Sequence, residues 1–274
     1  MSTLAEVLTQ INSWPVTNAA TVAVDRSGLV AYQGDLHRIF PIASVSKLLS
    51  AYGCLIAIEE ETLGLDEPAG PPGSTVRHLL AHTSGYSFDN GVINAPATKR
   101  IYSNTGFEVL ANHLAESSGI TAQSYLTEAV LAPLSMDSTG FDGRSLAHGA
   151  RSSASDLARF VSELLNPTLV HAETLRDATS NQFGDLAGIL PGLGHQNPNP
   201  WGLGFEIRGH KAPHWTGLTN SPATYGHFGA SGTFVWIDPT LGLGLVVLTD
   251  EAFGPWAKHK WPELSDAVLG AYRP

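Results

Sequence analysis

The chain has 274 residues, of which 43% are hydrophobic and 15% are charged. This composition supports a sizeable core and excludes a disordered protein, and the length predicts one large domain or two closely packed ones. Acidic residues number 25 against 15 Lys plus Arg, so the net charge is −10 and basic residues form no cluster. Nucleic acids and anionic membranes are therefore not expected partners.

The beginning of the chain gives no sign of a secretion signal. No basic residue precedes Arg26, and Glu6 interrupts the opening segment, whereas a signal needs a basic region followed by an apolar run. The longest apolar stretches are too short to span a membrane. Cys54 is the only cysteine, which excludes an internal disulfide and a cysteine-based metal site. We expect a cytoplasmic protein without a membrane span.

The first elements in chain order are a helix, a hairpin and then several helices. A capping box at Thr3 and Glu6 predicts a helix to about Ser13, and 20–24 with 29–33 flank a tight turn typical of a β-hairpin. A helix is predicted after Thr105, capped by Thr105 with Glu108 and ended by Gly119. Another is predicted from Ser153 to Leu165, before Asn166-Pro167.

The last third of the chain changes to β-strand patterns. Leu203, Phe205 and Ile207 alternate, 233–237 and 243–248 are β-rich, and a final helix ends near Tyr272. We predict Gly192–Pro200 to be a flexible loop.

This order of elements predicts an α/β (α+β) fold. The early hairpin joins the late strands in one antiparallel sheet, which the N- and C-terminal helices flank. Residues 1–40 and 190–274 would form this sheet lobe. Residues 41–189 would form an inserted, mostly helical lobe.

The segment Ile39–Ile58 carries the first chemical signal. Lys47 is its only charged residue, and a helix beginning near Ser44 would be apolar almost all round and therefore buried. Burial of an ammonium group is costly and lowers its pKa, so Lys47 could accept a proton from Ser44, one turn earlier. The S-x-x-K pattern predicts a hydroxyl nucleophile with an amine base, although an N-cap serine and a snorkelling lysine would give the same letters.

Two further patterns follow: Tyr102-Ser103-Asn104 before a helix, and His227-Phe228-Gly229-Ala230 before a strand. With Ser44 and Lys47, they resemble the S-x-x-K, Y-x-N and H-x-G motifs of the serine β-lactamase and penicillin-binding-protein superfamily. The similarity is greatest to the class C β-lactamases and to related esterases and D-amino-acid peptidases. The segments 79–85 and 201–205 also resemble that family.

The resemblance implies a role for each matching residue. Ser44 would attack the carbonyl carbon, and Lys47 and Tyr102 would carry the proton, with Tyr102 favoured as the base. The backbone N–H groups of Ser44 and Ala230 would form the oxyanion hole. Three further residues would contact the substrate: Asn104 by hydrogen bonding an amide, Gly229 by letting it approach the strand, and His227 in place of the usual lysine.

These features together predict a serine hydrolase that acts through an acyl-enzyme on a small-molecule or peptide-like ester, amide or β-lactam, without a metal or other cofactor. Because a neutral histidine would attract a carboxylate less than a lysine does, we favour esterase or D-peptidase activity. We expect His227 to gain charge as the pH falls toward 5.5. A true β-lactamase and a catalytically silent binding protein remain the alternatives.

Other chemistries are less well supported by the sequence. G-x-S-x-G does not occur, so the nucleophile elbow of an α/β-hydrolase is absent. His78 and His82 have the spacing of a helical metal-ligand pair, but a structural role is favoured because H-E-x-x-H does not occur. The glycines near 202 and 242 lack the third glycine of a dinucleotide site.

Overall fold

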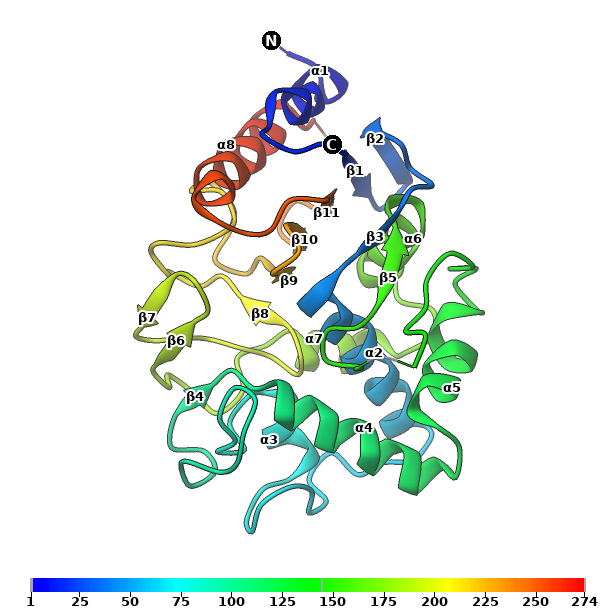
Figure 1. Ribbon diagram of the computed structural model, residues 1–274, viewed down its shortest axis with the longest axis vertical. Coiled ribbons are helices and arrows are strands. Elements are labelled where there is room, and N and C mark those ends of the chain that lie inside the picture. The colour runs from blue at the N-terminus through cyan, green and yellow to red at the C-terminus, as the bar shows by residue number, and fades with distance from the viewer. Residues whose placement is uncertain (1, 144, 274) are drawn as a thin grey trace.

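The computed structural model describes residues 2–143 and 145–273, and its centre is an antiparallel sheet (Figure 1). The strand order is β2-β1-β11-β10-β9-β8. The early hairpin β1-β2 therefore joins the late strands in one sheet, as the sequence predicts, through the pairing of β1 with β11. The bounds are β1 (Ala19–Asp25), β2 (Gly28–Gly34), β8 (Glu206–Ile207), β9 (Tyr225–Gly229), β10 (Thr233–Asp238) and β11 (Leu243–Thr249).

The two terminal helices cover one face of this sheet (Figure 1). They are α1 (Leu4–Leu8), extended by the 3-10 helix η1 (Thr9–Ser13), and α8 (Pro255–Ala271). The predicted Thr3–Glu6 capping box is present at the start of α1. Trp236 of β10 donates a hydrogen bond from its indole nitrogen to Ser265 of α8 at 3.1 Å.

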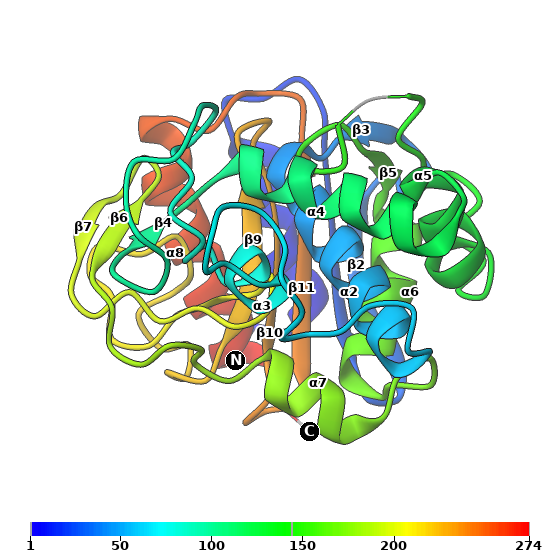
Figure 2. The same ribbon diagram turned by 90° about the horizontal axis from the view of Figure 1, so that it is seen from below.

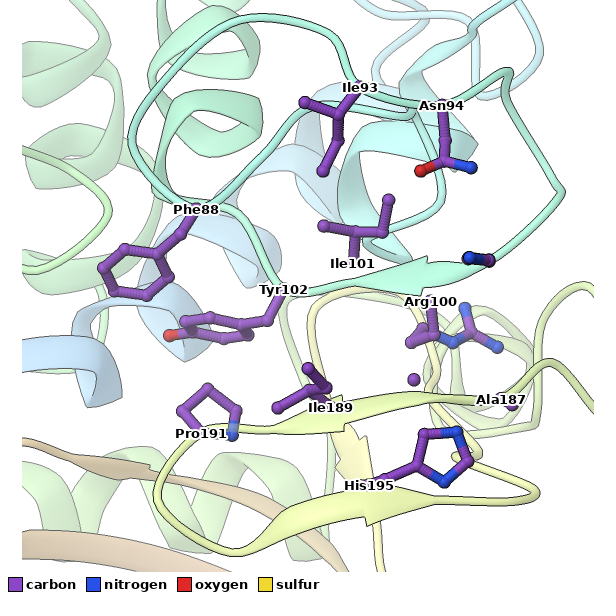
Figure 3. Close-up of a pocket in the computed structure, with 12 residues that line it drawn as sticks. Phe88, Ile93, Asn94, Arg100, Ile101, Tyr102, Ala187, Ile189, Pro191 and His195 are labelled. Atoms are coloured by element: carbon purple, nitrogen blue, oxygen red, sulfur yellow. The ribbon is translucent and has the colours of Figure 1, made fainter.

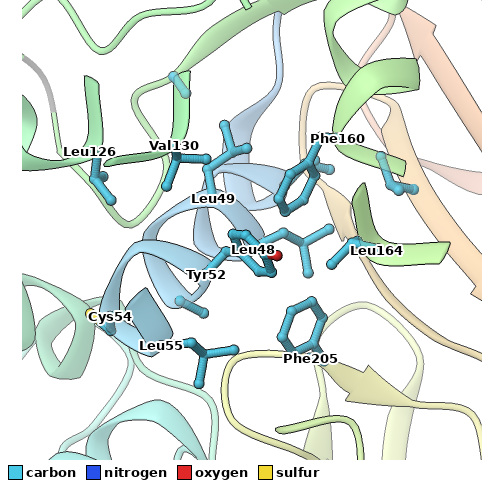
Figure 4. Packing of buried hydrophobic residues seen from close by; sticks show 14 of the residues in the cluster. Leu48, Leu49, Tyr52, Cys54, Leu55, Leu126, Val130, Phe160, Leu164 and Phe205 are labelled. Carbon is cyan, nitrogen blue, oxygen red and sulfur yellow. The ribbon is translucent and has the colours of Figure 1, made fainter. Parts of the chain in front are cut away.

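Helices α2 (Ser46–Glu59) and α6 (Ala154–Leu165) belong to the core on the other face of the sheet. Alternate residues of one strand divide between the faces, since Val22 and Val24 of β1 lie in this core and Ala23 lies in the other. Figure 4 shows Leu48 and Tyr52 of α2 packed among side chains that include Phe160 and Leu164 of α6. Because α6 packs on β1 and β11, part of the range expected to form the helical lobe covers the sheet itself.

The remaining elements surround α2 and form two small sheets (Figure 2). Their bounds are β3 (Ile39–Pro41), η2 (Ala43–Val45), α3 (Val76–Leu80), β4 (Arg100–Ile101), α4 (Asn104–Ser118), α5 (Ala122–Leu126), η3 (Thr127–Leu131), β5 (Arg151–Ser153), α7 (Ala172–Ala178), β6 (Gly188–Leu190) and β7 (Gly194–Gln196). Strand β3 pairs with β5, and the second small sheet has the order β4-β6-β7. Within the described residues, no helix is both long and apolar enough to span a membrane.

Three predictions about individual elements need correction. Helix α4 is capped by Ser103, whose hydroxyl accepts from the N–H of Gly106, rather than by Thr105. The Gly192–Pro200 segment contains β7 and the fully buried Asn199, so it is an ordered hairpin arm rather than a flexible loop. The alternation from Leu203 to Ile207 gives a strand of only two residues.

Candidate active site

Ser44 lies in the short helix η2, which connects β3 to α2. Ala43, directly before it, has φ = 45°, a left-handed conformation that is strained for a residue with a Cβ. Two hydrogen bonds hold this turn: the Thr233 hydroxyl donates to the carbonyl of Ile42 at 3.0 Å, and the Ser46 hydroxyl donates to that of Ala43 at 2.6 Å. The fold therefore fixes the backbone on both sides of Ser44.

Gly229 of β9 is packed directly against the same turn. A Cβ added to Gly229 would lie 2.4 Å from the Ile42 carbonyl oxygen and 2.6 Å from the Thr233 hydroxyl. The sequence analysis attributed this glycine to the approach of a substrate. In the structure, the atoms that require a glycine here belong to the turn that carries Ser44.

Lys47 is fully buried on the first turn of α2, three residues after Ser44. Its ammonium group donates to Asn104 Oδ1 at 2.6 Å and to the carbonyl of Ala147 at 2.8 Å, and it lies 4.8 Å from the centre of the Tyr102 ring. Burial lowers the pKa of Lys47 to about 7, although the charges of Glu108 and Asp89 act in the opposite direction. A large fraction of Lys47 is therefore neutral near neutral pH.

Tyr102 lies between β4 and α4, with its hydroxyl group facing Ser44. Burial raises the pKa of the phenol, and the interaction with Ser44 offsets only part of this effect. The ring packs on His82 at 4.6 Å and on His227 at 5.5 Å between centroids. Tyr102 is thus held rigidly, in its protonated form, beside the predicted nucleophile.

Asn104 is occupied at both ends of its side-chain amide. Its oxygen accepts from Lys47, and its nitrogen donates to Asp89 Oδ1 at 2.8 Å. These bonds connect Lys47 to an exposed carboxylate through a neutral group. The contact expected between Asn104 and a substrate amide would have to compete with them.

His227 is buried in the middle of β9, and its Nδ1 lies 2.7 Å from the backbone oxygen of Phe228. Burial lowers its pKa to about 3. A carbonyl oxygen can only accept, so Nδ1 carries the proton of the neutral ring and Nε2 is a bare acceptor. The expectation that His227 gains charge near pH 5.5 is therefore wrong, because the ring has too little water around it.

Ser44, Tyr102, His227 and Ala230 meet at a small cavity of about 80 Å³. Trp201 also lines it, and the indole nitrogen of Trp201 and Nε2 of His227 are buried with no hydrogen-bond partner among the described residues. We call this space the Ser44 chamber. It offers this donor and this acceptor, together with the Tyr102 hydroxyl, which is also buried without a hydrogen-bond partner in the part of the chain that the structure describes, and the set suits a hydroxyl group or a water molecule.

A buried charge cluster that the sequence did not predict adjoins this chamber. Glu206 lines the chamber and pairs with Lys211, while His214 and the Trp215 indole approach its carboxylate at 3.0 and 2.7 Å. Burial alone would raise the pKa of Glu206, but His214 and Lys211 lower it to about 2. Glu206 is the only charged residue in 201–207, the same signal that identified Lys47.

The two histidines with metal-ligand spacing have separate partners. Nδ1 of His78 lies 2.8 Å from the Thr75 hydroxyl, whereas Nδ1 of His82 accepts from the N–H of Ser103 at 3.1 Å. Helix α3 ends at Leu80, so His82 lies beyond it and the helical spacing does not apply. His82 instead supports the ring of Tyr102.

Comparisons with known proteins agree on one family. The family model described as Beta-lactamase matches residues 15–269. A β-lactamase structure from Mycobacterium bovis is 51% identical with a TM-score of 0.95, covering 96% of this chain and 98% of that one. EstCE1, described as a hydrolase with promiscuous acyltransferase activity, is 17% identical with a TM-score of 0.81, covering 97% of each chain.

A curated relative matches over a shorter range. Penicillin-binding protein 4* of Bacillus subtilis (strain 168) is 27% identical over 143 residues, which cover 40% of this chain. The match spans about a third (32%) of the length of that relative.

Proposed function

The chain belongs to the β-lactamase family, and we propose that it is a serine hydrolase that forms an acyl-enzyme on Ser44 and prefers esters. One observation carries this proposal. Lys47 is completely buried three residues after Ser44, and its ammonium group donates to two neutral oxygens, Asn104 Oδ1 and the carbonyl of Ala147. An amine in this position is costly for the fold, and the lowered pKa makes it suitable as a proton acceptor.

Acylation would begin with attack of the Ser44 oxygen on the carbonyl carbon. The Ser44 proton passes by way of the Tyr102 hydroxyl to neutral Lys47, and the C=O electron pair moves to the oxygen. The N–H groups of Ser44 and Ala230 would stabilise that oxyanion. When the C–O bond to the leaving group breaks, the alkoxide takes a proton back from Tyr102, which Lys47 re-protonates.

The pKa shifts change the balance between the two proton carriers. The sequence favoured Tyr102 as the base, but its pKa is raised while that of Lys47 is lowered to about 7. Lys47 is therefore the better acceptor, and Tyr102 relays the proton. In deacylation, a water molecule in the Ser44 chamber would donate one hydrogen bond to His227 Nε2, attack the acyl carbon and pass its other proton through Tyr102 to Lys47. The bond between the acyl carbon and the Ser44 oxygen then breaks, and the Ser44 oxygen takes that proton back by the same route.

The preference for esters rests on His227. A carboxylate next to the scissile bond would meet a neutral acceptor there, since burial keeps this imidazole uncharged. D-amino-acid amides are the next candidates. Hydrolysis of β-lactams is the alternative that the 51% identical M. bovis β-lactamase supports, and a silent binding protein is the alternative without chemistry.

The nucleophile is tested by intact-mass analysis after exposure to a fluorophosphonate, an activated ester and a penicillin. We expect covalent mass on the wild-type protein and none on Ser44→Ala. Ser50→Ala is the matched control, because Ser50 is a buried serine of α2, the helix that follows η2, and it donates to the Leu146 carbonyl at 2.8 Å. Labelling that persists in Ser44→Ala would contradict the mechanism. Failure of all three reagents to label the wild type would favour the binding protein.

The relay is tested by Tyr102→Phe, which removes the hydroxyl and keeps the ring that packs on Lys47. Loss of a positioned proton carrier lowers the rate by roughly 10²–10⁴-fold. We expect a decrease in kcat of this size in steady-state ester hydrolysis, with an unchanged melting temperature as the control for folding. Near-normal turnover would mean that Lys47 takes the proton without Tyr102.

A further inference from the structure

A large apolar groove lies next to the Ser44 chamber, and Figure 3 shows the residues that line the groove. Its volume is about 530 Å³, compared with about 80 Å³ for the chamber. Phe88, Tyr102 and Pro191 line both spaces. The two spaces are therefore adjacent, and a chain that passes these three side chains would connect Ser44 with the groove.

The walls of the groove are large aliphatic side chains that the fold leaves on its surface. Ile93 and Ile189 are 62% and 63% exposed. Ile101 and Ile189 are paired in register across the parallel strands β4 and β6. Figure 3 shows these three side chains directed toward the space beyond the Tyr102 ring, with Asn94 and His195 at the far end.

Two cationic residues line the groove, Arg100 and Lys99, and the rest of its lining is mostly apolar. The Arg100 guanidinium is occupied, because it donates to the carbonyls of Ala81 and Gln182 at 2.6 and 2.7 Å, whereas Lys99 is exposed to solvent. Strand β6 is paired on both edges, with β4 and with β7, so it cannot accept a peptide as an added strand. The groove therefore suits a hydrocarbon chain.

Resting on the proposed hydrolase activity, we propose that this groove binds the acyl chain of the substrate, an unbranched aliphatic chain attached to the carbonyl that Ser44 attacks. The assignment to the acyl side follows from the chamber. The departing oxygen needs a proton from Tyr102, and the attacking water needs the acceptor of His227, so the oxygen side of the ester belongs in the chamber. The groove is then left for the acyl chain.

The test is a chain-length series of p-nitrophenyl esters from acetate to octanoate, measured as kcat/KM. We expect a rise of about two- to fourfold for each methylene that enters the groove, followed by a plateau where the chain reaches Asn94 and His195. Ile189→Glu and, from the opposite wall, Ile93→Glu should each lower the octanoate-to-acetate ratio by at least about tenfold, because a carboxylate would contact the chain. Leu218→Glu is the control: Leu218 is 82% exposed and outside the groove, so the ratio should not change.

A second arm locates the chain. Alkyl acetates of increasing alcohol length should show no comparable rise, and a rise confined to them would overturn the acyl assignment. A flat acyl series, or equal losses on acetate and octanoate in both glutamate variants, would also overturn it. These results differ from failure of the proposed function, in which the wild type hydrolyses no ester or Ser44→Ala hydrolyses it equally well.

Discussion

Two lysines of this protein are buried, and their surroundings are opposite. Lys211 pairs with the carboxylate of Glu206, with His214 and Trp215 completing the cluster. Lys47 donates to an amide oxygen and a backbone carbonyl, and the carboxylates that influence it, those of Glu108 and Asp89, act through Coulomb interaction only. One lysine has a counter-ion in contact and the other does not.

The difference separates a structural charge from a chemical one. A buried pair keeps both groups ionised, and losing one partner leaves an uncompensated charge. A buried amine without a counter-ion in contact loses its proton readily, as the pKa of about 7 for Lys47 indicates. Both lysines also lie near an aromatic ring, Tyr102 at 4.8 Å and Trp201 at 5.4 Å, so the ring contact does not distinguish them.

The largest effect is expected for Lys47→Met, which replaces the amine by an apolar side chain of similar length. Ester turnover should fall by about 10³–10⁴-fold, because the proton acceptor is lost. The free energy of unfolding should stay within about 1 kcal/mol of the wild type or increase, since no buried counter-ion is left unpaired. Steady-state kinetics and urea denaturation measure the two quantities. A stability loss as large as the one expected for Lys211 would show that Lys47 is structural.

Lys211→Met should give the reverse result, a large loss of stability and a smaller loss of activity per folded molecule. Removing Lys211 leaves the buried Glu206 carboxylate without its cation, and breaking such a pair costs about 3–5 kcal/mol. Adding Glu206→Gln to this variant should restore part of the stability, and the two-variant comparison is the control. If the double variant is no more stable than Lys211→Met, the pair is not what stabilises this region.

The pH dependence tests whether Lys47 titrates near neutral pH. Lys47 must be neutral to accept a proton, so kcat/KM for an uncharged ester should rise by up to about tenfold per pH unit below 7 and level off above it. Its folded pKa is below the unfolded value of 10.5, so the unfolded chain binds more protons between the two values. Stability should therefore increase from about pH 7 upward.

Lys47→Met is the control for that linkage, because it keeps Lys211 and every other titrating group. The variant should lose the part of the stability increase above about pH 7 that Lys47 contributes. Equal slopes for the two proteins, measured by urea denaturation at several pH values, would mean that Lys47 does not titrate in this range.

The smallest effect is expected at His227, a buried basic residue that lines the Ser44 chamber. Because burial lowers its pKa to about 3, the imidazole stays neutral at ordinary pH. The kcat/KM ratio between a carboxylate-bearing ester and a neutral ester should change less than about twofold between pH 5.5 and 7.5. A several-fold rise toward the acidic end would mean that His227 becomes protonated and attracts the carboxylate.

Short-range patterns in the sequence were sufficient for the elements and for the nucleophile segment. The capping box at Thr3, the hairpin around the turn after Asp25 and the termination of α4 at Gly119 all depend on neighbouring residues, and the structure contains each of them. The apolar segment around Lys47 predicted burial of its amine, and the amine is buried. The joining of the first and last strands followed from the order of elements alone.

What the sequence by itself determined is therefore the spacing of Ser44 and Lys47, the burial of the amine and the architecture that carries them. Only the tertiary structure decided their electrostatics, because the pKa of a buried group depends on atoms far away in the chain. Lys47 is held by Asn104 and Ala147, 57 and 100 residues later. The apolar groove likewise exists only because β4 and β6 are brought together from segments almost 90 residues apart. Contacts of that range are fixed by packing of the whole core, whereas helix caps and turns are fixed by adjacent residues.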